Sequence, residues 1–124
     1  MPVRFCLLAS LAALAVACGV PHEVAKQAEQ VGSIAAEGSL LARDVRQADT
    51  TATFARVHAE ALRQKLAPLA DTVEDDDLAR VVRTVDEQLA ALEGHPGDAR
   101  AAAGVERRLD DAAKRSDEIE KGAA

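Results

Sequence analysis

Three histidines are the first candidates for metal binding or proton transfer in this sequence. His58 lies one helical turn after Phe54 and one turn before Leu62. A metal site on a helix needs a second histidine or a carboxylate three or four residues away. The corresponding positions around His58 hold only alanine, phenylalanine and leucine. We therefore expect a structural histidine there, and we expect His22 and His95 at the surface.

The acidic run Glu74-Asp75-Asp76-Asp77 is a second candidate, because clustered carboxylates attract calcium. A calcium-binding loop alternates its ligands, carries a central glycine and ends on a glutamate, and this run has none of these features. Carboxylates in the first turn of a helix stabilise its dipole, and Thr72 followed by Asp75 approximates a capping box. The run therefore predicts the start of a helix, and no metal ligands are predicted.

Cysteine and serine are the remaining candidates for nucleophilic catalysis. The two cysteines, Cys6 and Cys18, both lie near the start of the sequence, and Ser33, Ser39 and Ser116 stand in no local motif of an activated serine. The sequence also has no glycine-rich phosphate-binding loop. We therefore predict no catalytic residues and no cofactor, and we do not expect an enzyme.

Residues 1–17 have the pattern of a secretory signal peptide. Arg4 provides a positive start, and the apolar stretch 5–16 is shorter than the roughly 17–25 residues that a membrane-spanning helix needs. The small residues in Ala15-Val16-Ala17 fit the usual cleavage pattern. The predicted cut therefore lies between Ala17 and Cys18, and an uncleaved membrane anchor is the alternative.

The segment Leu14-Ala15-Val16-Ala17-Cys18 resembles the lipobox of bacterial lipoproteins, in which apolar and small residues precede an obligatory cysteine. The cysteine supplies the thiolate nucleophile that accepts a diacylglyceryl group. Ala15 stands where the family more often has leucine. The resemblance covers the first eighteen residues. It implies that Cys18 is lipidated and attaches the mature chain to a lipid bilayer in the bacterial cell envelope, at the outer face of the cell membrane or of the outer membrane.

The composition of the whole chain favours closely packed helices. Hydrophobic residues make up 48% of the 124 residues and aromatic residues 2%, and much of the apolar fraction is alanine. Alanine is the best helix former and buries little area. Because one of the 15 basic residues, Arg4, lies in the predicted leader, 14 basic residues face 21 acidic ones beyond it, which gives a formal net charge of −7. Such a surface repels phosphate backbones, so nucleic acid is not an expected partner.

The spacing of apolar residues predicts an all-α chain in which an up-down four-helix bundle over residues 22–121 follows the lipoprotein signal peptide and a short lipidated tether at 18–21. Helices are expected at about 22–47, 52–67, 75–93 and 99–121, with a frayed tail at 122–124. Pro68 is expected to end or kink the second helix. Four alternating helices would return the C-terminus to the end that holds Cys18.

Turn residues and apolar positions support these boundaries. Asp49, Thr50 and Thr51 offer N-cap side chains for the second helix, and Asp98 is expected to cap the fourth. Gly94 is expected just beyond the end of the third helix. The predicted core consists of the large apolar residues on one face of each helix: Val31, Ile34, Leu41, Val45, Phe54, Val57, Leu62, Leu66, Val81, Val82, Val85, Leu89, Val105 and Leu109.

A row of small residues runs along the first predicted helix at alternate spacings of four and three: Ala28, Gly32, Ala35, Ser39 and Ala42. Small residues let another helix approach closely. One interpretation is close packing within the bundle, and the other is a face that docks the helix of a partner.

These observations together favour a non-catalytic, membrane-anchored lipoprotein that acts as an interaction or scaffold module for an unknown protein partner. A second hypothesis is a small-molecule- or metal-binding module of the envelope, since apolar ligands can lodge between bundle helices. A third is a homo-oligomer formed through the long first helix.

Overall fold

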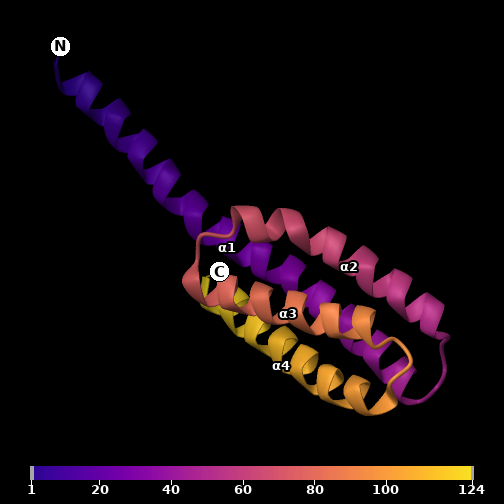
Figure 1. Cartoon of the computed structure of the whole chain (residues 1–124). Coiled ribbons are helices and arrows are strands. Elements are labelled where there is room, and N and C mark those ends of the chain that lie inside the picture. Colours follow the sequence, from indigo (N-terminus) through magenta and orange to yellow (C-terminus); the bar gives the residue numbers. More distant parts are fainter. Residues whose placement is uncertain (1, 124) are drawn as a thin grey trace.

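The computed structural model describes the backbone of residues 2–123 and the side chains of residues 22–123. This part of the chain forms four helices and no strand: α1 (Pro2–Arg46), α2 (Ala52–Thr72), α3 (Asp76–Gly94) and α4 (Ala99–Ala123). They make an all-helical bundle, as predicted (Figure 1). The signal peptide at 1–17, the cleavage between Ala17 and Cys18, the lipidation of Cys18 and the tether at 18–21 lie outside the residues with described side chains.

Successive helices of the bundle run in alternating directions (Figure 1). Each helix packs on its neighbour in the chain, and α1 packs most extensively on α4, so the four helices form a closed ring. The end of α4 returns to the region where α1 enters the bundle, beside the turn between α2 and α3 (Figure 1). His22 lies at this end, because the next residue, Glu23, lines a groove together with Thr72 and Asp75 beside the α2–α3 turn. The α1–α2 and α3–α4 turns lie at the opposite end (Figure 1).

The core lies along the axis of the bundle and consists of leucine, valine, isoleucine and many alanines. All predicted core positions are buried except Phe54 and Val57, which are 57% and 55% exposed. Their assignment to the core was wrong because α2 buries a different stripe, Ala55, Ala59, Leu62 and Leu66. That stripe keeps the spacing of four and three that holds one face of a helix toward its neighbours. Phe54 precedes it by one residue and is therefore turned away from the core.

The predicted caps at Thr51 and Asp98 are confirmed. Thr51 Oγ1 accepts a hydrogen bond from Phe54 N at 3.1 Å, and Asp98 Oδ1 accepts one from Ala101 N at 3.0 Å. At the start of α3, Asp75 Oδ1 accepts from Leu78 N at 2.9 Å. The capping role predicted for Thr72 is wrong, because its hydroxyl donates to a carbonyl inside α2.

The end of α3 also differs from its prediction. Gly94 is the last helical residue, not the residue beyond the helix. The turn that follows contains no glycine with positive φ. It closes instead through Asp98 N, which donates to His95 O at 3.2 Å, so the chain reverses without a left-handed residue.

Pro68 lies inside α2, which continues to Thr72 and does not end near residue 67. A proline removes one helical hydrogen bond and crowds the preceding turn. The last turn is nevertheless held, because Thr72 Oγ1 donates to Pro68 O at 3.1 Å and Val73 N donates to Leu69 O at 2.9 Å. Leu69 and Val73 also pack against the core, which fixes this end of α2. Similarly, α4 continues to Ala123, through two of the three residues predicted as a frayed tail.

The turn between α1 and α2 contains Ala48, a non-glycine residue with positive φ, at 57°. Asp49 N donates to Asp44 O at 2.8 Å, and Ala48 N donates to Val45 O at 3.1 Å. These two hydrogen bonds satisfy carbonyl groups at the end of α1 in the way that a glycine-terminated helix does. The alanine therefore occupies a position whose backbone favours glycine.

Candidate functional site

The predicted row of small residues on α1 is directed toward α4 of the same chain. Ala28, Ala35, Ser39 and Ala42 are buried, and Gly32 is half-buried. A Cβ atom added to Gly32 would lie 3.3 Å from Ser116 Cβ, so the two helices approach closely. Close packing within the bundle is therefore the arrangement that these residues adopt. The alternative of a free docking face is wrong for this row, because α4 covers it.

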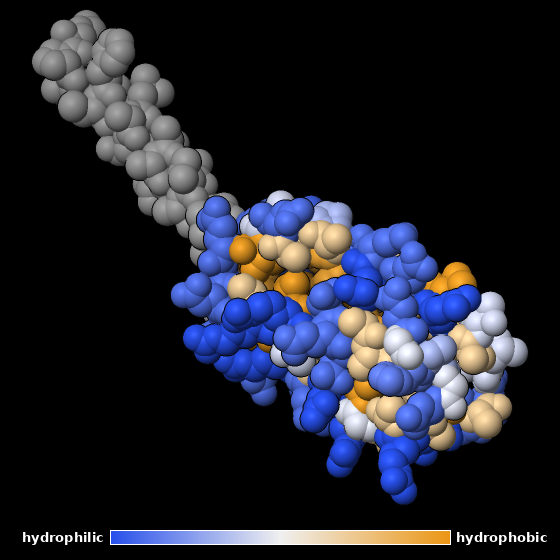
Figure 2. Space-filling model, in the orientation of Figure 1, coloured by the Kyte–Doolittle hydropathy of each residue, from blue (hydrophilic) through white to orange (hydrophobic). Residues whose placement is uncertain are grey.

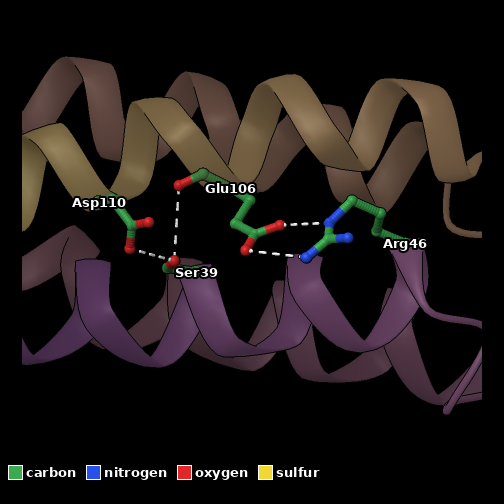
Figure 3. Close-up of polar contacts among 4 residues, drawn as sticks. All are labelled: Ser39, Arg46, Glu106 and Asp110. Atoms are coloured by element: carbon green, nitrogen blue, oxygen red, sulfur yellow. Dashed lines mark hydrogen bonds and ion pairs between the residues drawn. The ribbon is translucent and has the colours of Figure 1, made fainter.

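Polar side chains close the outer border between α1 and α4 (Figure 3). Ser39 Oγ donates to Asp110 Oδ1 at 2.5 Å and lies 3.5 Å from Glu106 O. Arg46 donates to the Glu106 carboxylate through Nε at 2.7 Å and through Nη2 at 3.3 Å. The hydrogen bonds with Glu106 raise the pKa of Arg46 above its ordinary value. This border is therefore occupied by contacts within the chain.

Arginine contacts also bridge the α2–α3 and α3–α4 borders. Arg63 on α2 donates to Asp86 at 3.0 Å and to Glu93 at 2.8 Å, both on α3. Hydrogen bonding to Asp86, and then to Glu93, raises the pKa of Arg63. Between α3 and α4, Asp77 and Arg115 form an ion pair at 3.7 Å.

The line along which α1 and α2 meet at the surface, called here the α1–α2 seam, is different. Among the side chains that the structure describes, one polar contact crosses it: His58 Nε2 to Glu37 Oε1 at 3.4 Å. The His58 ring also meets Phe54 edge to face, with centroids 5.4 Å apart. His58 is half-buried. No arginine bridge closes this seam in the described part of the chain.

The exposed large hydrophobic residues of the bundle, as far as its side chains are described, all lie beside this seam. Leu40 on α1 is 51% exposed, and Phe54 and Val57 on α2 are exposed to a similar degree. The contact between Glu37 and His58 shows that these two residues lie at the same height along the bundle axis. Because α1 and α2 are antiparallel, Leu40, three residues after Glu37, lies at the height of the first turns of α2. These three residues are called here the apolar patch. Apolar surface is visible where α2 begins, at the right of Figure 2.

A groove continues along the same seam toward the other end of the bundle. It has a volume of about 590 Å³ and is lined by Lys26, Glu29, Ser33 and Glu37 from α1 and by Lys65, Pro68 and Leu69 from α2, with Ile34 among the other lining residues. The patch and the groove share faces of their helices, because Phe54, Ala61, Lys65 and Pro68 recur at helical spacing. The α1–α2 seam is thus one elongated surface with an apolar end and a charged end.

The other predicted candidates show no reactive arrangement. Asp75 caps α3, and Asp77 contacts Arg80 and Arg115, so the acidic run begins a helix as predicted. His22, Ser33 and His95 are exposed. Across residues 22–123, no group of three metal-ligating side chains comes together. Within the described residues, no helix is both long enough and apolar enough to span a membrane.

The fold and this surface define an all-helical bundle with a groove along the seam between α1 and α2. Comparison of the chain with protein-family models, with curated proteins and with solved structures found no match.

Sequence reasoning missed the apolar patch because it assigned Phe54 and Val57 to the core. A signal was present in the pattern of α2. Its apolar residues form two stripes, and only Ala55, Ala59, Leu62 and Leu66 keep an uninterrupted spacing of four and three. Leu69 continues that stripe by three residues and packs against the core, whereas Phe54 and Val57 fall outside it and are exposed.

Proposed function

We propose that this protein is a non-catalytic lipoprotein of the bacterial cell envelope, anchored through Cys18, and that it binds a protein partner through the α1–α2 seam. The observation that carries the anchoring is the segment Leu14-Ala15-Val16-Ala17-Cys18, in which a short apolar run ends at a cysteine four residues before His22. A signal peptide at 1–17 and a tether at 18–21 are part of this proposal. The bundle would then lie at the outer face of the membrane.

The geometry of the bundle supports a protein rather than the bilayer as the occupant of the apolar patch. His22 lies at one end of the bundle, and Leu40 lies 18 residues further along the same helix. At 1.5 Å per residue this corresponds to about 27 Å along the axis. A patch so far from the anchored end is out of reach of the bilayer when the bundle stands upright on the membrane.

The chemistry of the seam fits a helix or another elongated partner. Contiguous exposed apolar surface marks an interaction site when polar residues border it. The apolar patch supplies anchoring positions for apolar side chains, and Glu29 and Lys65 in the groove supply charges of both signs. This is the arrangement of a surface that binds an amphipathic helix.

The intact mass of the protein extracted with detergent from bacterial membranes tests the anchoring. We expect a chain that begins at Cys18 and carries added lipid mass, and we expect the Cys18→Ala variant to lose that mass. A wild-type chain that begins at Cys18 without added mass would contradict the lipid anchor. A detectable turnover in the purified protein would contradict the non-catalytic assignment.

The groove supports the alternative function, a small-molecule-binding module of the envelope. Its volume of about 590 Å³ falls within the range of ligand sites in proteins, roughly 300–1,000 Å³. Thermal shift of the purified protein against metals and lipids tests this function, because a ligand that binds only the folded state raises the melting temperature. A rise in melting temperature that Lys65→Ala abolishes would support the alternative, and no rise with any ligand in excess would contradict it.

A further inference from the structure

We propose that the occupant of the α1–α2 seam is a second copy of this chain, in a parallel dimer in which α1 of each copy packs against α2 of the other. This proposal names the partner of the surface described above and rests on the proposed function in its use of the membrane anchor. Closed two-fold symmetry is the commonest form of soluble oligomers and requires a self-complementary surface.

Along the bundle axis, residues of opposite charge on α1 and α2 lie at the same height. Glu37 and His58 are level, since their side chains are 3.4 Å apart. Two further turns along the antiparallel helices, Glu29 of α1 is level with Lys65 of α2, and both line the same groove. A two-fold axis parallel to the bundle brings Glu29 of one copy to the height of Lys65 of the other. The symmetry then gives two such pairs of opposite charge.

The apolar patch favours the parallel orientation over the antiparallel one. Leu40, Phe54 and Val57 lie together at the end of the seam nearest the α1–α2 turn. In a parallel dimer, the apolar patch of one chain faces the apolar patch of the other chain, so apolar surface covers apolar surface. An antiparallel dimer would instead place it against the end that holds Lys26 and Lys65. Burying those ammonium groups against apolar side chains is costly.

Small residues on α1 leave room for the partner's helix. Ser33 and Ala36 lie between Glu29 and Leu40 on the outer side of α1, and both are exposed. On α2, Ala61 lies between Phe54 and Lys65 and is exposed as well. A facing helix therefore meets short side chains at the middle of the seam and longer ones at its two ends.

Anchoring through Cys18 would select the same orientation. Two chains held by one membrane have their His22 ends on the same side, which is the parallel arrangement. Confinement to one surface raises the effective concentration of the two copies for each other. The dimer that forms in detergent should therefore be more fully populated at the membrane.

Sedimentation equilibrium of the full mature chain in detergent, with a charge-swap series, tests this dimer. We expect the wild type to dimerise and each of Glu29→Lys and Lys65→Glu to raise the dimer dissociation constant at least about tenfold, since each change replaces two attractive pairs by two repulsive ones. The double variant Glu29→Lys/Lys65→Glu should restore the constant to within about threefold of the wild type, because it recreates both pairs.

Arg56→Glu is the matched control, because Arg56 is exposed on α2 about half a helical turn away from Lys65 around the helix axis. It reverses the same charge outside the seam, and we expect an unchanged dissociation constant. The melting temperature of each variant, measured in parallel, confirms that the chain is folded. A monomeric wild type, single variants that dimerise normally, or a double variant as weak as the single ones would overturn the proposal. A dimer without lipid mass would contradict the anchor alone, and a lipidated monomer would contradict the dimer alone.

Discussion

The side of α1 that faces α4 and the side that faces α2 are built from different types of residue. Toward α4, the helix presents alanine, glycine and serine, all buried or half-buried, and Arg46 closes the border through Glu106. Toward α2, it presents Lys26, Glu29 and Glu37 along a groove. One side of the helix therefore stabilises the bundle, and the other leaves surface available for association.

Residue size explains why one seam is closed and the other is open. Small side chains let the backbones of two helices approach closely. Many weak atom–atom contacts then form along the seam, and their dispersion energies add up. Gly32 shows this close approach to α4, because a Cβ atom there would lie 3.3 Å from Ser116 Cβ and 4.0 Å from Ala113 O. Charged residues on flexible stems border the α2 side, and they remain solvated only if the two helices leave space between them.

Enlarging a small residue on the closed side should have the largest effect. Ala35 is fully buried, so Ala35→Leu overpacks the α1–α4 contact and should lower the free energy of unfolding by about 2–3 kcal/mol. Ser33→Leu is the matched control, because Ser33 lies two residues away and faces the groove. Urea unfolding of both variants should show a loss for Ala35→Leu and a change within about 0.5 kcal/mol for Ser33→Leu. Equal losses would mean that the two sides do not differ.

Removing the buried hydroxyl on the closed side should have an intermediate effect. Ser39 Oγ donates to Asp110, and Ser39→Ala removes this hydrogen bond while Asp110 remains exposed to water. We expect a loss of about 1 kcal/mol by chemical denaturation. Ser33→Ala, which removes an exposed hydroxyl from the other side, should leave the stability unchanged or slightly higher. A loss for Ser33→Ala as large as that for Ser39→Ala would contradict the assignment.

The turn that leads from α1 to α2 allows a smaller, stabilising change. Ala48 has a φ of 57°, which glycine adopts without steric cost. Ala48→Gly should raise the free energy of unfolding by about 0.5–1 kcal/mol, measured as a higher melting temperature. Ala36→Gly, in the middle of α1 on an exposed position, is the control and should instead destabilise by up to about 1 kcal/mol. A destabilised Ala48→Gly variant would show that the turn is not formed as described.

Loss of the ion pairs that close the α2–α3 border should have the smallest effect. Arg63 contacts both Asp86 and Glu93, but its side chain is 37% exposed, so solvent screens the pairs. Arg63→Gln should lower the free energy of unfolding by about 0.5 kcal/mol, and the loss should shrink in 1 M salt. Arg56→Gln, which removes an exposed arginine elsewhere on the same helix, should be neutral. A loss for Arg63→Gln that persists in high salt would point to packing of its stem instead.

Local sequence patterns predicted the helices, two of the caps and most of the core, because these depend on spacing of apolar residues and on single side chains such as Thr51 and Asp98. They did not predict which of two overlapping stripes on α2 is buried. Phe54 and Val57 are the larger residues, but Ala55 and Ala59 fit beside the core. The choice depends on the register between helices, which no single helix encodes. The continuation of α2 through Pro68 likewise depends on Leu69 and Val73 packing on the core.

The candidate surface was less predictable than the fold. The row of small residues was recognised, but its partner was not, because several helices with small faces could have covered it. The α1–α2 seam is crossed by a contact between residues from different helices, Glu37 and His58. Which residues remain exposed along it depends on which faces of α1 and α2 are buried against α3 and α4. Such a surface can be found only when all four helices are placed.

Chemical cross-linking in membranes tests most directly the central claim, that α1 leaves the α2 side open for another anchored chain. Ala61→Cys introduces a thiol in the middle of the seam, and Glu60→Cys introduces one at the neighbouring exposed position outside it. Treating membranes that contain each variant with a flexible bismaleimide should give a dimer for Ala61→Cys, and none for Glu60→Cys or for the wild type, whose Cys18 carries lipid. The absence of a dimer with Ala61→Cys, or equal dimer for both variants, would contradict the account.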